Sequence, residues 1–216
     1  MILTDGTSHN FALNFQLSRS SIDNPIYTRR GSQFTLGLKI TPPYSLIKGT
    51  TDAQYAQMTS SEKYNLLEYH KWRFSGKVFT PLSADSKLVL MARAEFGYLG
   101  HYNKNAKSPF ESFYMGGDGM SSYSSYSTEY VAMRGYQSGS LTPYDPATGR
   151  NMGYVYNKFT MELRYPIALE QNATIWALAF VEAGNCFADI KDYNPFNLKR
   201  SAGVGVRLFL PMFGLM

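Results

Sequence analysis

The sequence predicts an all-β fold, namely a partial antiparallel transmembrane β-barrel of about seven strands. Apolar and polar residues alternate with a period of two; in residues 34–41, Phe, Leu, Leu and Ile alternate with Thr, Gly, Lys and Thr. The alternating segments exceed the ~5–6 residues usual in soluble sheets and match the ~9–11 residues of a tilted membrane-crossing strand. Short turns and long loops also alternate along the chain, which is typical of outer-membrane barrels.

Seven segments follow this alternation in order along the chain. Because successive side chains of a strand point to opposite faces, each segment predicts an apolar face toward lipid and a polar face toward a lumen. The predicted strands are 9–18, 32–42, 68–80, 87–99, 156–167, 173–184 and 198–210. The residues predicted to face lipid include Phe11, Leu13, Leu90, Phe159, Leu163, Val204 and Val206. Those predicted to face the lumen include Lys39, Arg93, Glu95, Glu162 and Arg207.

The connections separate the two ends of the predicted barrel. Short turns are expected at 81–86, at 168–172 and from 211 onward, and long loops at 42–64, 101–154 and 185–197. The connection 19–31 lies on the short-turn side but is longer than its partners. Bacterial barrels usually have an even number of strands, and exported proteins begin with a signal peptide that residues 1–10 do not resemble. We therefore expect the chain to be part of a larger barrel protein.

The composition narrows the class of protein. Hydrophobic residues make up 44% of the 216 residues, charged residues 17% and aromatic residues 15%, which disfavours disorder and suits a membrane interface. The net charge of +5 comes from scattered Lys and Arg, so nucleic-acid binding is not expected. The one cysteine, Cys186, and the three histidines lack ligand spacing, so we expect no metal and no cofactor. The sequence shows no nucleophile–base pair or phosphate loop, which predicts a protein that is not an enzyme.

The connection 101–154 is far longer than most loops, which favours a functional role. It contains a glycine pair, Gly116-Gly117, and then Arg134-Gly135-Tyr136, in which the glycine permits a tight turn that presents Arg and Tyr to one target. Glu162 and Glu182 are predicted on the lumen face of adjacent strands, where an inward-folded loop could place Arg134 against both carboxylates. On these residues alone, separate lumen charges solvated by water are the favoured interpretation, and the ion pair is the alternative.

Five segments in order resemble the C-terminal barrel of the BamA family of outer-membrane protein assembly factors, within the bacterial surface antigen superfamily. They are 113–117, Arg134-Gly135-Tyr136, 162–166, 180–184 and 200–205, and they contain the expected structural glycines Gly116, Gly117, Gly184, Gly203 and Gly205. The residues of these segments resemble those of Bacteroidetes-type members most. The resemblance implies a sixteen-stranded barrel with five upstream POTRA domains, of which residues 1–216 would be the eighth to fourteenth strands. The POTRA domains and the terminal strands would then be absent from this chain.

The resemblance also implies a function and a place for the long loop. Residues 101–155 would be the sixth extracellular loop, which folds into the lumen and pairs Arg134 with Glu182 and Glu162. The expected activity is assembly and insertion of β-barrel proteins in the cell outer membrane. The expected partners are outer-membrane lipid, unfolded outer-membrane protein clients and accessory lipoproteins. Three alternatives stay open: a passive outer-membrane channel, a two-partner secretion or translocation-assembly barrel, and a soluble lipid-binding β-protein.

Overall fold

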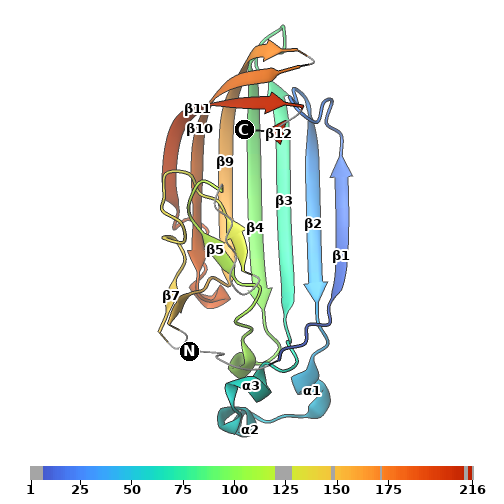
Figure 1. The fold of residues 1–216 in the computed structure, drawn as a ribbon, viewed down its shortest axis with the longest axis vertical. Helices are drawn as coiled ribbons and strands as arrows, with labels where there is room; N and C mark the ends of the chain where they lie inside the picture. The colour runs from blue at the N-terminus through green and yellow to red at the C-terminus, as the bar shows by residue number, and fades with distance from the viewer. Residues whose placement is uncertain (1–6, 120–127, 147–148, 171, 212–213, 216) are drawn as a thin grey trace.

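One large antiparallel sheet forms the body of the molecule in the computed structural model, which describes residues 7–119, 128–146, 149–170, 172–211 and 214–215. The sheet order is β1-β2-β3-β4-β9-β10-β11-β12, and every neighbouring pair is antiparallel, which confirms the predicted fold class (Figure 1). The seven long strands are β1 (Leu13–Ser20), β2 (Gly31–Ile40), β3 (His70–Pro81), β4 (Val89–Gly100), β9 (Val155–Leu169), β10 (Thr174–Phe187) and β11 (Lys199–Leu210).

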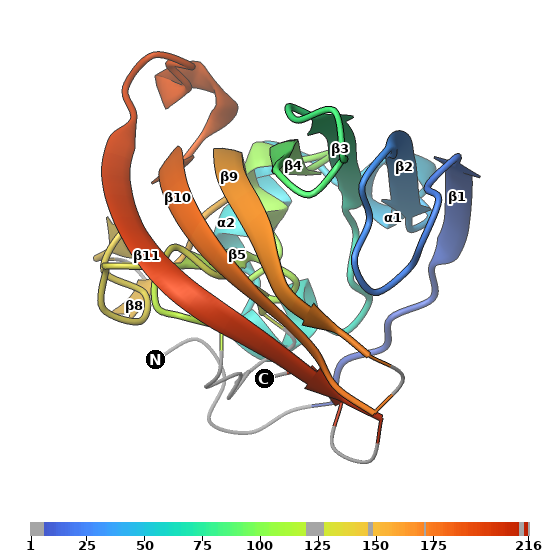
Figure 2. The same cartoon turned by 90° about the horizontal axis from the view of Figure 1, so that it is seen from above.

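The sheet is curved and open. Seen from above, its strands follow an arc, and the two ends of the arc do not meet (Figure 2). Among the described residues, β1 does not pair with β12 (Gly214–Leu215), which itself pairs only with β11. The turn expected from residue 211 therefore leads into a short strand, although residues 212–213 of that turn lie outside the described residues. This open trough fits a partial barrel.

The predicted strand limits differ most at the first strand. β1 begins at Leu13 and not at residue 9, because His9 instead forms an isolated parallel bridge with Leu66. The exposed Phe11 consequently lies ahead of β1. β9 and β10 are longer than predicted, at 15 and 14 residues. β9 gains two residues at the short-turn end and one at the long-loop end, whereas β10 extends only toward the loop that follows it.

The two faces of the sheet differ as the alternation predicts. On β9, the outward Phe159 is 44% exposed, whereas the inward Glu162 is 1% exposed. Six of the residues predicted to face lipid are exposed or half-buried on the outer side, namely Leu13, Leu90, Phe159, Leu163, Val204 and Val206, whereas Phe11 is exposed but lies ahead of β1. The predicted lumen residues line the cavities of the inner side: Lys39, Arg93, Glu95, Glu162 and Arg207. The predicted register is therefore confirmed.

The long connections lie at one end of the sheet and the short turns at the other. The loop expected at 42–64 contains three short helices, α1 (Tyr44–Lys48), α2 (Asp52–Gln57) and α3 (Ser60–Lys63), which the sequence reading did not predict. Thr51 with Gln54 and Thr59 with Glu62 form capping boxes that start α2 and α3. A short 3₁₀ turn, η2 (Ile190–Asp192), lies in the loop after β10. No helix in the described ranges is long and apolar enough to cross a membrane.

The connection 19–31 is longer than a plain turn because it folds back onto the inner face of the sheet. Its Tyr27 is 4% exposed, packs edge-on against Trp176 at 5.7 Å between ring centroids, and donates its hydroxyl hydrogen to the Lys87 carbonyl. An apolar cluster at the short-turn end is formed by Tyr27, Phe79, Val89, Met91, Trp176 and Leu178. We call these six residues the turn-end cluster.

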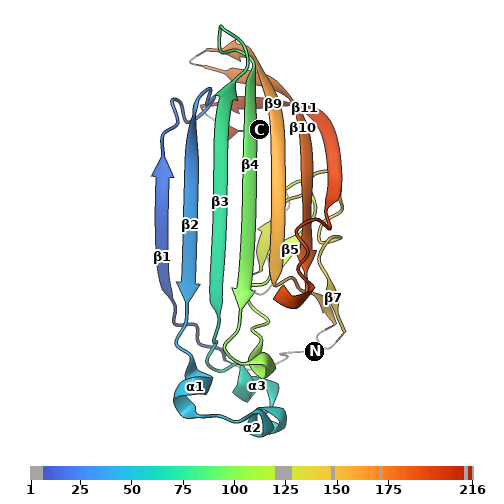
Figure 3. The ribbon, with the colours of Figure 1, turned by 180° about the vertical axis from the view of Figure 1, so that it is seen from behind.

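The connection between β4 and β9 lies on the concave side of the sheet, in front of the strands in Figure 1 and behind them in Figure 3. Its described parts are ordered by their own short elements, including a parallel pair of β5 and β6. These elements are η1 (Lys104–Ala106), β5 (Phe113–Met115), β6 (Glu129–Val131), β7 (Tyr144–Asp145) and β8 (Arg150–Asn151). Phe113, Met115 and Met133 are fully buried between this loop and the sheet. The loop is thus packed against the inner wall.

Candidate functional site in the barrel interior

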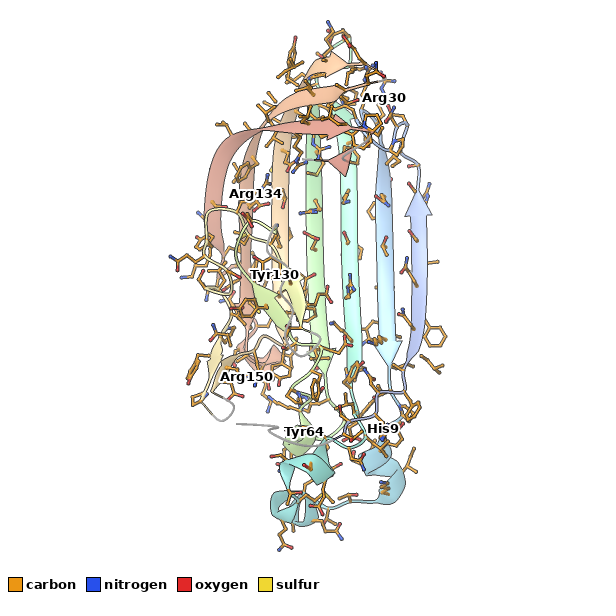
Figure 4. The ribbon with its side chains drawn as sticks, in the orientation of Figure 1. His9, Arg30, Tyr64, Tyr130, Arg134 and Arg150 are labelled. Atoms are coloured by element: carbon orange, nitrogen blue, oxygen red, sulfur yellow. The ribbon has the colours of Figure 1, made fainter. Side chains whose placement is uncertain are left out.

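The tip of the long loop reaches the inner wall about midway along the strands. Arg134 lies between Arg30 at the turn end and Tyr64 at the helix end (Figure 4). The residues around it come from β9, β10 and β11, which are neighbours in the sheet. Glu162 lies opposite Phe180 in the β9–β10 register, and Glu182 lies opposite Thr160. Both carboxylates therefore share the face that the loop covers.

Arg134 contacts Glu182 through both its backbone and its side chain. The Arg134 amide donates to Glu182 Oε2 at 2.9 Å. The guanidinium donates to Glu182 Oε1 from Nε at 3.1 Å and from Nη2 at 2.8 Å. Glu182 is 1% exposed, so this carboxylate is bound at three points in a nearly dry position. Charge-assisted bonds of this kind are stronger and more directional than neutral ones.

Glu162 is shared by three arginines. Arg134 Nη2 donates to Glu162 Oε1 at 2.9 Å, and Arg207 Nη2 donates to the same oxygen at 2.8 Å. Arg164, two residues along the same strand, donates to Oε2 from Nη2 at 2.7 Å and from Nε at 3.0 Å. The ion pair that the sequence left as an alternative is therefore present, and Glu162 also joins β9, β11 and the loop tip.

Besides Arg207, which was predicted only to face the lumen, two residues of β9 that the sequence did not predict for the site complete it. Lys158 forms an ion pair with Glu182 at 3.2 Å, is almost fully buried, and donates to the Ala132 carbonyl of the loop. Arg164 holds the second oxygen of Glu162. Lys158 and Arg164 both lie at even positions of β9, on the same face as Glu162. The period-two alternation therefore predicts that they face the site.

An aromatic ring supports the Arg134 guanidinium from the wall. The guanidinium carbon lies 3.6 Å from the ring centroid of Phe180, a cation–π contact. Gly203 on β11 lies opposite Phe180, and a methyl group there would come within 2.8 Å of the ring tip. Gly203 thus provides the space for the ring. At Gly205 the nearest atom would be 3.9 Å away, which is ordinary contact, so the structure shows no such requirement there.

The other two residues of the tip fix its path. Gly135 has φ +84°, a left-handed conformation that glycine adopts without strain, and it passes close to Ser201. Tyr136 donates its hydroxyl hydrogen to the Arg200 carbonyl at 2.8 Å. The Arg-Gly-Tyr segment is therefore joined to three neighbouring strands, with Arg134 on β9 and β10 and Tyr136 on β11.

The remaining predicted glycines lie where backbone or side chains approach closely. A methyl group at Gly116 would meet the Gln137 carbonyl oxygen at 2.3 Å, and one at Gly117 would meet the Tyr130 hydroxyl oxygen at 1.9 Å. At Gly184, on β10, it would lie 2.6 Å from the Asn157 carbonyl oxygen. Gly116 and Gly117 thus allow the loop to pack on itself, whereas Gly184 allows β10 to lie close to β9 and to Met115 of the loop.

The arrangement is suited to holding a loop against a wall. A cavity of about 350 Å³ beside the tip is lined by Lys77, Arg93, Arg134, Lys158, Arg164, Arg207, Asp118, Glu162 and Glu182, among others. Within the described ranges, no group of three or more His, Cys, Asp or Glu could hold a metal ion. The wall carboxylates of Glu162 and Glu182 are already bound by cationic side chains. The chemistry of the site is therefore ion pairing and hydrogen bonding.

Comparison with known proteins agrees with the fold. The Omp85 superfamily domain matches residues 2–216. The fold is similar to that in the crystal structure of BamA from Haemophilus ducreyi lacking POTRA domains 1–3, with a TM-score of 0.65 and 18% sequence identity. The similarity covers 95% of this chain and 37% of that chain, so this chain spans little more than a third of the protein it matches. A search of curated protein sequences finds no match.

Proposed function

Because this chain belongs to the Omp85 superfamily, we propose that it is the C-terminal barrel segment of a BamA-like factor that assembles and inserts β-barrel proteins into the outer membrane. The superfamily supports a barrel of the outer membrane that acts in assembly or insertion. The finer assignment, to a Bacteroidetes-type central subunit that works with accessory lipoproteins and upstream POTRA domains, is part of the proposal.

The observation that carries the proposal is the tip of the inward-folded loop. Arg134 binds Glu182 and Glu162 inside the barrel wall, with Phe180 beneath the guanidinium. A loop that only narrowed a channel would need charge in the lumen but no multipoint bond to two strands. Here the tip is bonded to β9, β10 and β11, which makes it part of the wall.

The proposed activity needs no covalent chemistry. A client strand in lipid must pair every backbone N–H and C=O group, because an unpaired group in hydrocarbon costs several kcal/mol. That requirement supplies the driving force for folding, and an assembly factor lowers the barrier by thinning the bilayer and presenting strand edges. The loop tip acts in this process as a brace that keeps the wall of the barrel in one arrangement. Outer-membrane lipid and unfolded barrel clients are the corresponding partners.

The proposal is tested with the full-length protein in two assays. In cells, the variant is the only copy of the factor. In lipid vesicles, the protein is supplied with a urea-unfolded client barrel. We expect Arg134→Ala and Glu182→Gln to slow client folding, because each leaves a buried charge with fewer partners. Arg30→Ala removes an exposed arginine at the turn end and is the matched control.

A passive channel or a secretion barrel predicts different results in the same vesicles. A channel would conduct ions, and a two-partner secretion barrel would export its own substrate, in each case with no effect on client folding. Client folding at the wild-type rate with both site variants would contradict the proposal, and so would a wild-type protein that fails to accelerate folding at all.

A further inference from the structure

A second group of charges joins the long loop to the opposite part of the wall. Glu111 lies just before β5 and accepts a bond from Lys39 of β2 at 2.6 Å and from Lys71 of β3 at 3.2 Å. Glu129, in β6, forms ion pairs with Lys71 at 2.9 Å and with Arg73 at 3.1 Å. Neither carboxylate takes part in the Arg134 site.

Lys71 is the centre of this group. Its side chain is 4% exposed, and its ammonium contacts both carboxylates and the Glu111 backbone carbonyl at 2.8 Å. It also lies 4.9 Å from the centroid of the buried Phe113 ring. A buried ammonium is stable only when its charge is matched and its hydrogens are bonded. The loop, through Glu111 and Glu129, supplies both conditions.

The short elements of the loop bring these two carboxylates together. β5 and β6 pair in parallel, with Phe113 opposite Glu129, so the chain just before β5 lies near the start of β6. Glu111 itself has φ +67°, a left-handed conformation that a residue with a side chain rarely adopts. Such a conformation persists where surrounding contacts hold it. Here the bonds from Lys39 and Lys71 do so.

We propose that the cluster of Lys71 with Glu111 and Glu129 is a second anchor, and that the long loop is a strut fixed at two places on the wall. The first anchor, at Arg134, lies on β9, β10 and β11, whereas the second lies on β2 and β3. β4 separates these two groups in the sheet order. The strut therefore spans the concave face and sets the distance between wall segments that do not pair with each other.

This proposal goes beyond the proposed function and does not depend on it. It concerns where the loop tip stands relative to β1–β3, and it assigns positioning roles to Lys71, Glu111 and Glu129. The two-anchor proposal is tested independently of the client-folding experiment, because the distance measurement between spin labels uses no client protein.

The test measures the position of the loop in the full-length protein in lipid vesicles. Spin labels on cysteines at Ser138, exposed beyond the tip, and Ser18, exposed on β1, report the distance across the strut. The buried Cys186 is replaced by alanine in this background. We expect a narrow distance distribution in the parent and a broader one in Lys71→Met and in Glu129→Gln. The matched control is Lys87→Met, which removes the exposed partner of Asp85 at the turn end and should leave the distribution unchanged.

Combining the two substitutions separates an anchor from a general loss of packing. If Lys71 and Glu129 act as one unit, the double variant should broaden the distribution no more than the worse single variant. Additive broadening, or distributions as narrow as the parent in all three variants, would overturn the proposal. If Lys71→Met does not insert into the membrane, the anchor is tested from the loop instead, with the double variant Glu111→Gln and Glu129→Gln. An unchanged distance distribution in that double variant would overturn the proposal, and a broadened one would support it.

Discussion

Replacing Gly203 by alanine should loosen the Arg134 site without touching any charge. The new methyl carbon would lie 2.8 Å from Phe180 Cζ and 2.9 Å from Cε1. Carbon atoms prefer separations of about 3.5–4.0 Å, so the ring must move by roughly 0.7–1.2 Å. Overpacking of this kind costs ~1–3 kcal/mol, and the shift also weakens the cation–π contact with Arg134, worth ~0.5–2 kcal/mol. Alanine returns about 0.5–1 kcal/mol because glycine weakens a strand.

We therefore expect Gly203→Ala to lower the free energy of unfolding by about 1–3 kcal/mol. The measurement is urea unfolding of the full-length protein in lipid vesicles, followed by tryptophan fluorescence. Gly205→Ala is the matched control on the same strand and face, since its nearest neighbour is Leu178 Cδ1 at 3.9 Å. It should be neutral or slightly stabilising.

A second substitution tests the cause of the loss. Phe180→Leu makes room for the methyl group but also removes the cation–π contact, so the effect of alanine at Gly203 is compared with and without this substitution. Gly203→Ala should cost less in the Phe180→Leu protein than in the parent. Equal urea midpoints for Gly203→Ala and Gly205→Ala would refute the reasoning. An equal cost of Gly203→Ala in both backgrounds would show that the methyl group does not act through the ring.

Three further predictions concern the loop tip, the outer face and the long-loop end. Tyr136→Phe should lower the free energy of unfolding by about 0.5–1.5 kcal/mol in the same urea assay, because it removes the bond to the Arg200 carbonyl. Val204→Arg, at an outward position that is 84% exposed, should cost ~2–4 kcal/mol in lipid if it lies at mid-bilayer, with little effect in a variant reconstituted in detergent alone. Burial raises the pKa of the Asp189 carboxyl, but hydrogen bonds from Lys107 and the Lys191 amide lower it by more. The pKa of Asp189 is therefore below its ordinary value of 3.8. Its contribution should be complete above that value and lost as pH falls through the lowered pKa, and limited proteolysis of the loops should show this acid sensitivity in the parent but not in Asp189→Asn.

Most of the sheet could be predicted from the sequence because strand alternation is a local signal. In the seven long strands the outward face is apolar and the inward face is largely polar, except at the turn-end cluster. A shift by one residue would put Glu162 in lipid and Phe159 in the lumen. The limits of β1 were predicted less well, since His9 pairs with Leu66 far along the chain. No local pattern encodes that bridge.

The three helices at 44–63 were missed although part of their signal is local. Thr51 with Gln54 and Thr59 with Glu62 are capping boxes that can be read from the sequence. The helices are only four to six residues long, so they show no amphipathic period. Their stability comes from packing at the end of the sheet.

Loop length and lumen parity singled out Arg134, Glu162 and Glu182 as candidates, but on these residues alone separate solvated charges were the favoured interpretation. Their pairing was predicted only by the resemblance to the family, and the outer contacts of the site were missed. The partners of Glu111 could not be predicted, since Lys39 lies 72 residues away in sequence and Lys71 lies 40 residues away. Which lysine meets which carboxylate depends on how the loop crosses the sheet, and alternation does not determine that path.

The turn-end cluster has a consequence for permeability. Tyr27, Phe79 and Trp176 give one part of the inner wall an apolar and aromatic surface at the end opposite the long loops. A hydrated ion gains no hydrogen bonds from hydrocarbon, so close approach to this surface costs it free energy of hydration. The turn-end cluster therefore makes this part of the wall less favourable for ions than the charged interior beside it.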